Sequence, residues 1–458
     1  MRRSDAHPSA VSPVRLVLRH FHVCICHSTS FPIMRSIHYP LLLLSAISSV
    51  LSEEPPVPKS VEHLVSITLT ANPEIRFYEA EIAKAQATRS TAGRQANPTI
   101  ELQYGKNKLM APETSSDGLA FSASLAQPIE WPGRLGLRKA IANRDIRLAE
   151  LGLERFRFHL ASRVRVLAYT LMAQQDVATA ASEVATRYAS LREVMVQREP
   201  AGIAPQLEIT TIEAAALVAE SRAAEAAVAV QNALLELNQL MGRRADAALV
   251  VKHAAFNMKP VPSLDSLMLA AMQNHYDLRV RRAELEQQGF KVELAKNERY
   301  PAITVGPFFQ QQNAPALENQ SVIGIGVSFP LPIWKNGKAE VTAAEARQMQ
   351  AQASLSTMQR DVERQVTASM LLYKTQHARL ALWKPGTVSK FSAAAELADQ
   401  HYRLGAVPMA TFVELQDKYL AAIEAINKTQ VNALDAGLNL EELTASPGRY
   451  ISTATSNP

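Results

Sequence analysis

Two patterns of apolar and polar residues alternate along the chain. In four short stretches every second residue is apolar and its neighbours are small or polar, which is the pattern of a β-strand with one apolar face. Longer stretches rich in alanine carry apolar residues at i, i+3, i+4 and i+7, which predicts closely packed amphipathic helices. The predicted strands span about residues 99–105, 119–127, 302–311 and 321–330, and the long helices about 134–199, 206–241, 338–403 and 409–443.

The chain repeats these patterns at a spacing of 203 residues. Two glycine–proline turns, 201–205 and 404–408, each lie between two predicted helices. Their glycines are 203 residues apart and so are their prolines, and the same spacing separates Pro98 from Pro301, which precede the first strand of each predicted pair. One spacing shared by turns and strands indicates a duplicated architecture.

The helix lengths agree with this duplication. From 134 to 198 the chain has no interior proline, so one helix there would be about 98 Å long at about 1.5 Å per residue. Two helical runs, 206–241 and 264–299, lead back towards the strands and together have a similar length. In the second repeat only 409–443 leads back, and we expect 60–96 to supply the other half of that returning length. The prediction is two antiparallel helical hairpins, each capped by a strand pair, with breaks near Asn72–Pro73 and at Pro385–Gly386.

The alternating stretches are typical of membrane strands, which turn an apolar face to lipid and a polar face to the lumen. A half-buried strand of a soluble protein shows the same alternation. An isolated four-helix coiled coil would explain the helices but would leave the strand pairs without a role. We therefore expect a membrane barrel. Four strands cannot close one, because about eight is the minimum, so several chains must build it.

The first 52 residues have the features of an export signal. Met34–Arg35 opens a short basic region, Pro40–Leu51 is an apolar core too short to span a bilayer, and a cleavage site precedes Glu53. We expect Met34 to be the true start, so that residues 1–33 are not translated. The 458 residues carry a net charge of +5, but removal of 1–52 leaves 43 basic against 42 acidic residues, which gives no nucleic-acid footprint.

The expected fold class is mainly α with membrane β-strands. The expected divisions are a leader at 1–52, a first repeat at 53–262, a second repeat at 263–445 and a flexible tail at 446–458.

Candidate ligands and catalytic groups are few. A cluster of soft-metal ligand types precedes the signal, so we expect the mature chain to lack it and to contain no cysteine. No motif for a nucleophile, a phosphate loop or a metalloprotease is found, so we expect neither an enzyme nor a cofactor or metal site. The cluster in the leader comprises His20, His22, Cys24, Cys26 and His27. The scattered histidines that we assign to surface or packing roles are His63, His159, His253, His275, His377 and His401.

Over about residues 60–445 the chain resembles the TolC-type outer-membrane factors, the exit ducts of bacterial tripartite efflux and type I secretion systems. The resemblance implies a homotrimer in which four strands per chain form a twelve-stranded barrel, continuous with a helical tunnel in the periplasm. It rests on the two glycine turns, the strand starts Asn97–Pro98 and Tyr300–Pro301, and the strand ends Gln127–Pro128–Ile129 and Phe329–Pro330–Leu331–Pro332. The segments Pro330–Ile333 and Asn336–Lys338 look like the heavy-metal-efflux branch.

In that family the two turns form the periplasmic tip where an adaptor protein docks. Glycine permits the left-handed backbone of a tight reversal, and proline is tolerated in the first turn of the helix that follows. A plain helix hairpin needs the same geometry. The resemblance assigns docking to Gly202, Ile203, Pro205, Gly405, Ala406 and Pro408.

Acidic residues follow both turns, in a register that differs between the repeats. Repeated threefold, they would form carboxylate rings that favour cations, as charged rings do in other pores. The alternative is a solvated helix face. The candidate gate residues are Glu208, Glu213, Glu414 and Asp417.

The resemblance implies a passive outer-membrane duct that works with a periplasmic adaptor and an inner-membrane pump. Metal cations are the expected substrate, and a type I secretion or drug-efflux duct is the alternative within the family. A periplasmic adaptor or a coiled-coil scaffold is the alternative of another class. An adaptor would have a helical hairpin without duplicated strand pairs.

Overall fold

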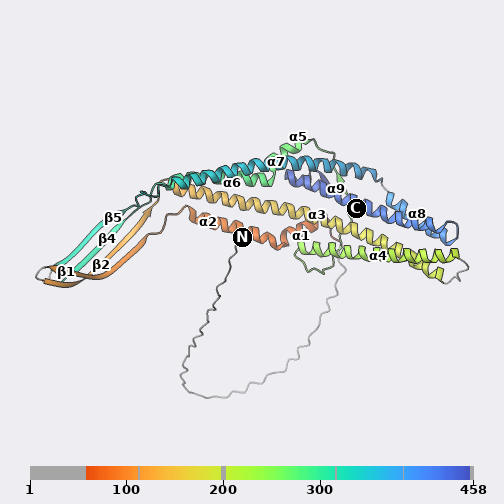
Figure 1. Ribbon diagram of the computed structural model, residues 1–458, viewed down its shortest axis with the longest axis horizontal. Coiled ribbons are helices and arrows are strands. Elements are labelled where there is room, and N and C mark those ends of the chain that lie inside the picture. Colours follow the sequence, from red (N-terminus) through yellow and green to blue (C-terminus); the bar gives the residue numbers. More distant parts are fainter. Residues whose placement is uncertain (1–57, 112–113, 197–202, 315–316, 385, 454–458) are drawn as a thin grey trace, which may run out of the picture. The chain divides into compact units, whose positions relative to one another are not determined.

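All residues that the structure describes belong to one of two units of the chain, Pro55–Pro458; the other unit is Met1–Glu54. The predicted leader and its cluster of histidines and cysteines therefore lie outside the described residues. Within the described part, no helix is long and apolar enough to cross a membrane. The computed structural model describes residues 58–111, 114–196, 203–314, 317–384 and 386–453 (Figure 1).

The two halves of the chain repeat one order of elements. Two short helices lead into two strands, a long helix runs away from the strands, and a further helix returns towards them (Figure 1). The first half comprises α1 (Val61–Ala71), α2 (Pro73–Ala92), β1 (Thr99–Ala111), β2 (Thr114–Ile129), α3 (Arg134–Val196), α4 (Ile203–Leu240) and β3 (Phe256–Met258). The second half comprises α5 (Leu264–Asn274), α6 (Tyr276–Glu298), β4 (Ile303–Ala314), β5 (Leu317–Ser328), α7 (Lys338–Leu382), α8 (Thr387–Arg403), α9 (Met409–Thr444) and β6 (Ile451–Thr453).

The break between the first two helices is built in the same way in both halves. Asn72 ends α1 and caps α2, because its side-chain oxygen accepts a hydrogen bond of 2.8 Å from the backbone N–H of Glu74. His275 does the same between α5 and α6, with its Nδ1 accepting from the N–H of Asp277 at 3.2 Å. Burial lowers the pKa of His275, which favours the neutral ring that this acceptor role requires. The apolar pattern predicted one unbroken helix over 264–299, and that prediction is wrong.

The four long strands form one antiparallel sheet in the order β1-β2-β4-β5. Tyr104 pairs with Phe121 within the first hairpin, and Phe121 pairs with Gln311 across the junction of the two repeats. Much of the stretch between the predicted strands 99–105 and 119–127 is also strand, because β1 and β2 stay paired as far as Ala111 and Thr114. The strands are longer than predicted because their outer ends lack the apolar alternation used to find them.

One face of the sheet exposes large apolar side chains at alternate positions. Ile100, Leu102 and Tyr104 of β1 are 73%, 66% and 74% exposed, and Ile323 and Ile325 of β5 are 79% and 76% exposed. Side chains of this size are normally buried in a soluble sheet, so this face requires an apolar partner.

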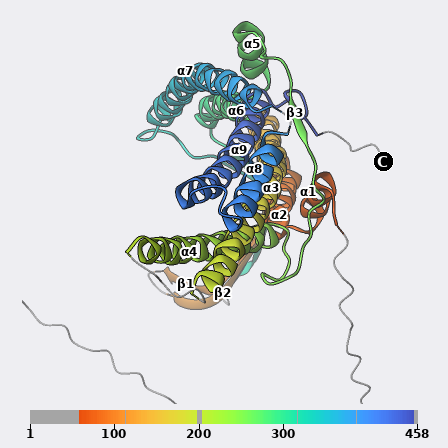
Figure 2. The ribbon, with the colours of Figure 1, turned by 90° about the vertical axis from the view of Figure 1, so that its right-hand side faces the viewer.

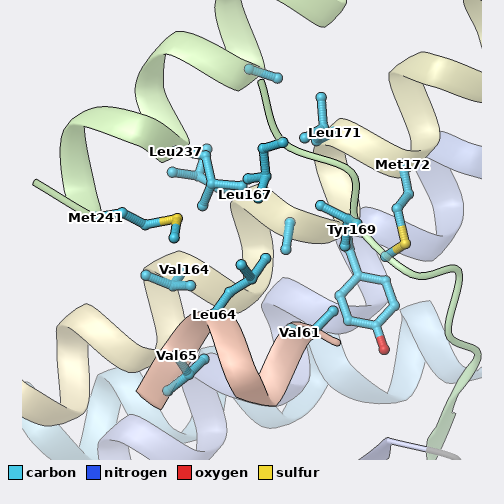
Figure 3. Close-up of a cluster of buried hydrophobic side chains, with 14 of the residues drawn as sticks. Val61, Leu64, Val65, Val164, Leu167, Tyr169, Leu171, Met172, Leu237 and Met241 are labelled. Atoms are coloured by element: carbon cyan, nitrogen blue, oxygen red, sulfur yellow. The ribbon is translucent and has the colours of Figure 1, made fainter. Parts of the chain in front are cut away.

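The helix α3 lies at the centre of the helical part. It packs against α4 on one side and α9 on the other, and it also contacts α1, α2 and α6 (Figures 1 and 2). One core cluster lies where α1 and α4 meet α3, with Leu64, Val164 and Leu237 fully buried (Figure 3). An ion pair closes its rim, because the Arg165 guanidinium donates to both carboxylate oxygens of Glu62 at 2.9 and 2.8 Å.

The segment after α9 is held in place by a buried carboxylate. Glu441, 2% exposed, accepts hydrogen bonds of 2.9 to 3.0 Å from the backbone N–H groups of Gly448, Tyr450 and Ile451. Tyr450 and Ile451 are buried, and β6 pairs with β3. The prediction of a flexible tail over 446–458 is therefore wrong as far as residue 453, and residues 454–458 lie outside the described residues.

The corresponding segment of the first half has the same arrangement with donor and acceptor exchanged. Asn238 stands 203 residues before Glu441, is fully buried, and donates to the carbonyls of Ala245 and Ala247 at 3.1 and 2.8 Å. The same register aligns Gly242, with φ +65°, with Ala445, whose φ of +47° is the one positive value of a non-glycine residue in the described chain.

We expect Glu441→Ala to loosen the C-terminal segment. The change leaves three backbone N–H groups without their acceptor, which costs about 1–3 kcal/mol. Hydrogen exchange followed by mass spectrometry should show faster exchange at residues 448–453. The matched control is Glu442→Ala, which removes only a partly exposed pair with His159 and should leave that exchange unchanged. Equal exchange in both variants would contradict the anchoring role of Glu441.

Candidate functional site

The turn between α8 and α9 is a complete left-handed helix cap. Gly405 has φ +72°, its N–H donates to the carbonyl of Tyr402 at 2.9 Å, and the N–H of Ala406 donates to the carbonyl of His401 at 2.8 Å. Pro408, with φ −70°, then occupies the position before α9, where its carbonyl accepts from the N–H of Thr411. Both ends of the turn are thus satisfied by local backbone bonds, so its side chains are left free for contacts elsewhere.

The turn is exposed. Leu404 is 81% exposed, and Gly405, Ala406 and Pro408 are exposed as well, while Val407 is half-buried. The equivalent Gly202 lies outside the described residues, and Ile203 and Pro205 lie in the first turn of α4.

An aromatic cluster supports the turn from inside the bundle. Phe412 is fully buried, stacks on Tyr402 with a ring separation of 5.4 Å, and meets Tyr188 edge-on at 5.3 Å. These rings come from α9, α8 and α3, so the cluster joins the second hairpin to the first. Burial raises the pKa of Tyr188, which therefore stays a neutral phenol.

Polar contacts link the same elements. Arg187 donates to Gln416 at 3.0 Å, and Gln416, fully buried, donates in turn to the carbonyl of Ala395 at 2.7 Å. Arg403 donates to the hydroxyl of Ser190 at 2.8 Å. The α8–α9 hairpin is therefore attached to α3 along its side and near its end.

The four predicted gate residues do not have one environment. Glu208, Glu213 and Glu414 are exposed and form no ion pair within the described residues. Asp417 instead forms an ion pair of 3.0 Å with Arg222, and the side chains of the two are 56% and 46% exposed. This pair joins α9 to α4, the two returning helices, across α3.

A groove of about 500 Å³ begins at this ion pair, between α3, α4 and α9. Its walls carry charges of both signs, with Arg222 and Lys428 against Glu225 and Glu424. Small and apolar side chains form much of the rest of the wall, among them Val177, Leu420 and Val431. Among the described residues, no group of three or more histidine, cysteine, aspartate or glutamate side chains is arranged to hold a metal ion.

Arg222 and the aromatic cluster were not predicted from the sequence. Arg222 lies 195 residues before Asp417. The only signal in the sequence that relates the two is the repeat, which makes α4 and α9 equivalent helices. Phe412 could have been found, because it is the first aromatic residue after the turn, where a buried contact is expected to fix the helix direction.

A model of the family described as outer membrane efflux protein matches residues 64–243 and 267–446, which together make up most of the chain. The second match begins 203 residues after the first, which is the spacing found in the sequence.

Individual relatives are distant. The cobalt-zinc-cadmium resistance protein CzcC of Cupriavidus metallidurans is 24% identical over 292 residues, which is 63% of this chain and 66%, just under two thirds, of that protein. The outer-membrane channel OprN has a similar structure, with a TM-score of 0.68, 17% identity, and coverage of 84% of this chain and 90% of OprN. CusC, a protein described as forming a transmembrane channel, has a TM-score of 0.66, 13% identity, and coverage of 86% and 95%. At these identities the structural likeness concerns the fold.

We expect Gly405→Ala to weaken the turn through backbone conformation alone. No atom lies within 4 Å of the place where a Cβ would stand, so the cost of about 1 kcal/mol comes from the left-handed φ. A cost of that size should make hydrogen exchange at the Ala406 amide about 5-fold faster. Gly405→Asn is the matched control, because asparagine tolerates this conformation and should exchange more slowly than the alanine variant. The same rate in both variants would mean that the left-handed φ of residue 405 does not determine the stability of the turn.

Proposed function

The chain belongs to the outer membrane efflux protein family, and from this premise we propose that three copies of it form the exit channel of a tripartite efflux system. The family consists of outer-membrane channels, so the chain is not an enzyme. A periplasmic adaptor or a soluble coiled-coil scaffold is no longer a competing class. In the proposed assembly the sheets span the outer membrane and the helices form a tunnel in the periplasm.

The exposed apolar face of the sheet is the observation that carries this proposal. Ile100, Leu102, Ile323 and Ile325 are each more than half exposed on alternate positions of β1 and β5. If this face contacts lipid, these side chains lie in an apolar environment and not in water. Twelve strands would result from three copies, which exceeds the minimum needed to close a barrel.

The tips would receive the adaptor. The proposed docking residues are Gly202, Ile203, Pro205, Gly405, Ala406 and Pro408, and the exposure of the second turn together with its self-satisfied backbone supports this role. We expect replacement of both Gly202 and Gly405 by valine to abolish chemical cross-linking to the adaptor, because a β-branched residue does not adopt the left-handed conformation of Gly405 and the 203-residue repeat predicts the same turn at Gly202. Unchanged cross-linking and unchanged efflux would contradict docking at these turns. Replacement of Gly405 by asparagine should preserve both.

The carboxylates beyond the tips would select cations at the tunnel mouth. Three residues per chain, Glu208, Glu213 and Glu414, are free to line it, whereas Asp417 would act with Arg222 as a tie between the two returning helices. In planar bilayers we expect the triple glutamine variant to lose about half or more of its preference for potassium over chloride. Glu225→Gln and Glu424→Gln, in the groove, are the controls. An unchanged reversal potential would assign the three glutamates to a solvated surface.

Divalent metal cations are the proposed substrate. The support is the relationship to CzcC, whose name records resistance to cobalt, zinc and cadmium, together with the acidic residues near the tips. A drug-efflux or type I secretion duct of the same family is the second candidate, because a passive duct carries what its pump delivers.

Deletion of the gene tests the substrate class. We expect the minimal inhibitory concentrations of cobalt, zinc and cadmium salts to fall about 4-fold or more, which is the loss of a major export route, and those of hydrophobic drugs to stay the same. Complementation with the intact chain should restore resistance. A change confined to drugs would favour the second candidate and would leave the channel proposal intact.

A further inference from the structure

An apolar stripe continues beyond the sheet in the second repeat. In β5, Ile323, Ile325 and Val327 are exposed at every second position, at 79%, 76% and 61%. After β5 ends at Ser328, the same spacing of two continues through residues that no longer belong to the sheet. The continuing members are Phe329, Leu331 and Ile333, which are 54%, 65% and 67% exposed.

The most exposed large apolar side chain of the described chain directly follows Ile333. Trp334 is 91% exposed, which leaves its indole almost without protein contact. Indole rings favour the boundary between lipid tails and headgroups, where an apolar ring and a polar N–H are both accommodated. An indole this exposed on a rigid segment needs a partner outside the chain.

The segment that carries these side chains is held in a fixed conformation. Pro330 and Pro332 restrict its backbone, and the N–H of Ile333 donates to the carbonyl of Leu331 at 2.9 Å. Asn336 then caps the backbone of Lys338 at the start of α7 with a bond of 3.2 Å. A segment fixed in this way loses little conformational entropy on binding.

The first repeat lacks this feature. At the equivalent place Trp131 is 37% exposed and stacks on Tyr300, with ring centroids 4.8 Å apart and planes 10° from parallel. Its ring is therefore used within the chain. The connection from strand to helix, Glu130–Gly133, is also shorter than the corresponding connection Phe329–Gly337.

Basic side chains flank the segment. Lys335, Lys338 and Arg299 form no ion pair within the described residues, and Glu340 is the acidic residue of the first turn of α7. Arg299 lies against this segment, because a Cβ at Gly337 would stand 2.6 Å from its Cγ. Free cations beside an exposed indole complement the phosphate groups of anionic phospholipids.

We propose that residues 329–335 form an anchor at the periplasmic boundary of the outer membrane, with Trp334 in the interfacial layer of a phospholipid leaflet and Lys335 at its headgroups. This inference rests on the proposed function, in which β5 faces lipid. It adds a lipid contact outside the sheet, once per chain and in the second repeat only.

The test is depth-dependent quenching of tryptophan fluorescence. The chain has three tryptophans, so Trp131→Phe with Trp383→Phe leaves Trp334 as the single fluorophore. The protein is reconstituted in vesicles of phosphatidylethanolamine and phosphatidylglycerol that contain phosphatidylcholine brominated either near the headgroup or near the chain end. We expect roughly twofold quenching by the shallow bromines and less by the deep ones. The variant that retains only Trp383, at the end of α7, is the control and should not be quenched.

A second variant separates this inference from the channel proposal. Ile323→Trp in a chain whose three tryptophans are phenylalanine reports whether β5 faces lipid. Quenching at 323 without quenching at 334 would overturn the anchor alone and would point to a second copy of the chain covering the segment. No quenching at either position would overturn the anchor and the membrane location of the sheet together.

A labelled thiol provides an independent measurement. Both cysteines, Cys24 and Cys26, lie in the predicted leader, so Trp334→Cys introduces a unique thiol in the processed chain. A nitroxide attached there should be more accessible to oxygen than to a water-soluble nickel chelate. The opposite order would place residue 334 in water and would overturn the anchor.

Discussion

The open edges of the sheet constrain the whole molecule. In the order β1-β2-β4-β5, the outer strands pair on one side only, which leaves rows of backbone donors and acceptors along 13 and 12 residues. In lipid these groups must be satisfied by another strand. The inner junction shows how, since β2 of one repeat pairs antiparallel with β4 of the other. Because the repeats are equivalent, β5 of one chain and β1 of the next would form the same kind of junction, and three copies would close the ring by repeating it.

Positions 203 residues apart bind the backbone of equivalent segments, although their side chains differ. Asn72 and His275 both cap a helix, one with an amide and the other with a neutral imidazole. Asn238 donates to two carbonyls, whereas Glu441 at the equivalent position accepts from N–H groups of equivalent residues. The loop presents carbonyl groups to the buried side chain in the first repeat and N–H groups in the second. The buried residue is accordingly a donor in one and an acceptor in the other, because a buried polar group without a partner is costly.

Features that depend on a local pattern can be predicted from this sequence, and features that depend on distant partners cannot. The helix that begins at Arg134, the break at Gly386 and the turn at Gly405 all follow from periodicity or from residues that allow a special backbone. The order of the segment after Ala445 could not be predicted, since it depends on the buried Glu441 and on pairing with β3, nearly 200 residues earlier. The same limit applies to the proposed gate residues. Nothing in the sequence around Asp417 indicates a partner, and only the fold brings Arg222 close to it.

The interactions near the turn at Gly405 differ in strength, which bears on how the proposed channel would open. Phe412 is fully buried between Tyr402 and Tyr188, and removal of such a side chain costs about 3–5 kcal/mol, so this cluster keeps the α8–α9 hairpin intact. The pair between Arg222 and Asp417 is about half exposed, and such pairs contribute at most about 1 kcal/mol. A partner that competes for either charge would therefore break this polar link between α4 and α9 at small cost while each hairpin stays folded. Movement at the proposed tip would then be a displacement of hairpins about α3, and the buried cluster that contains Ile212 of α4 and Leu420 of α9 would provide the larger resistance to it.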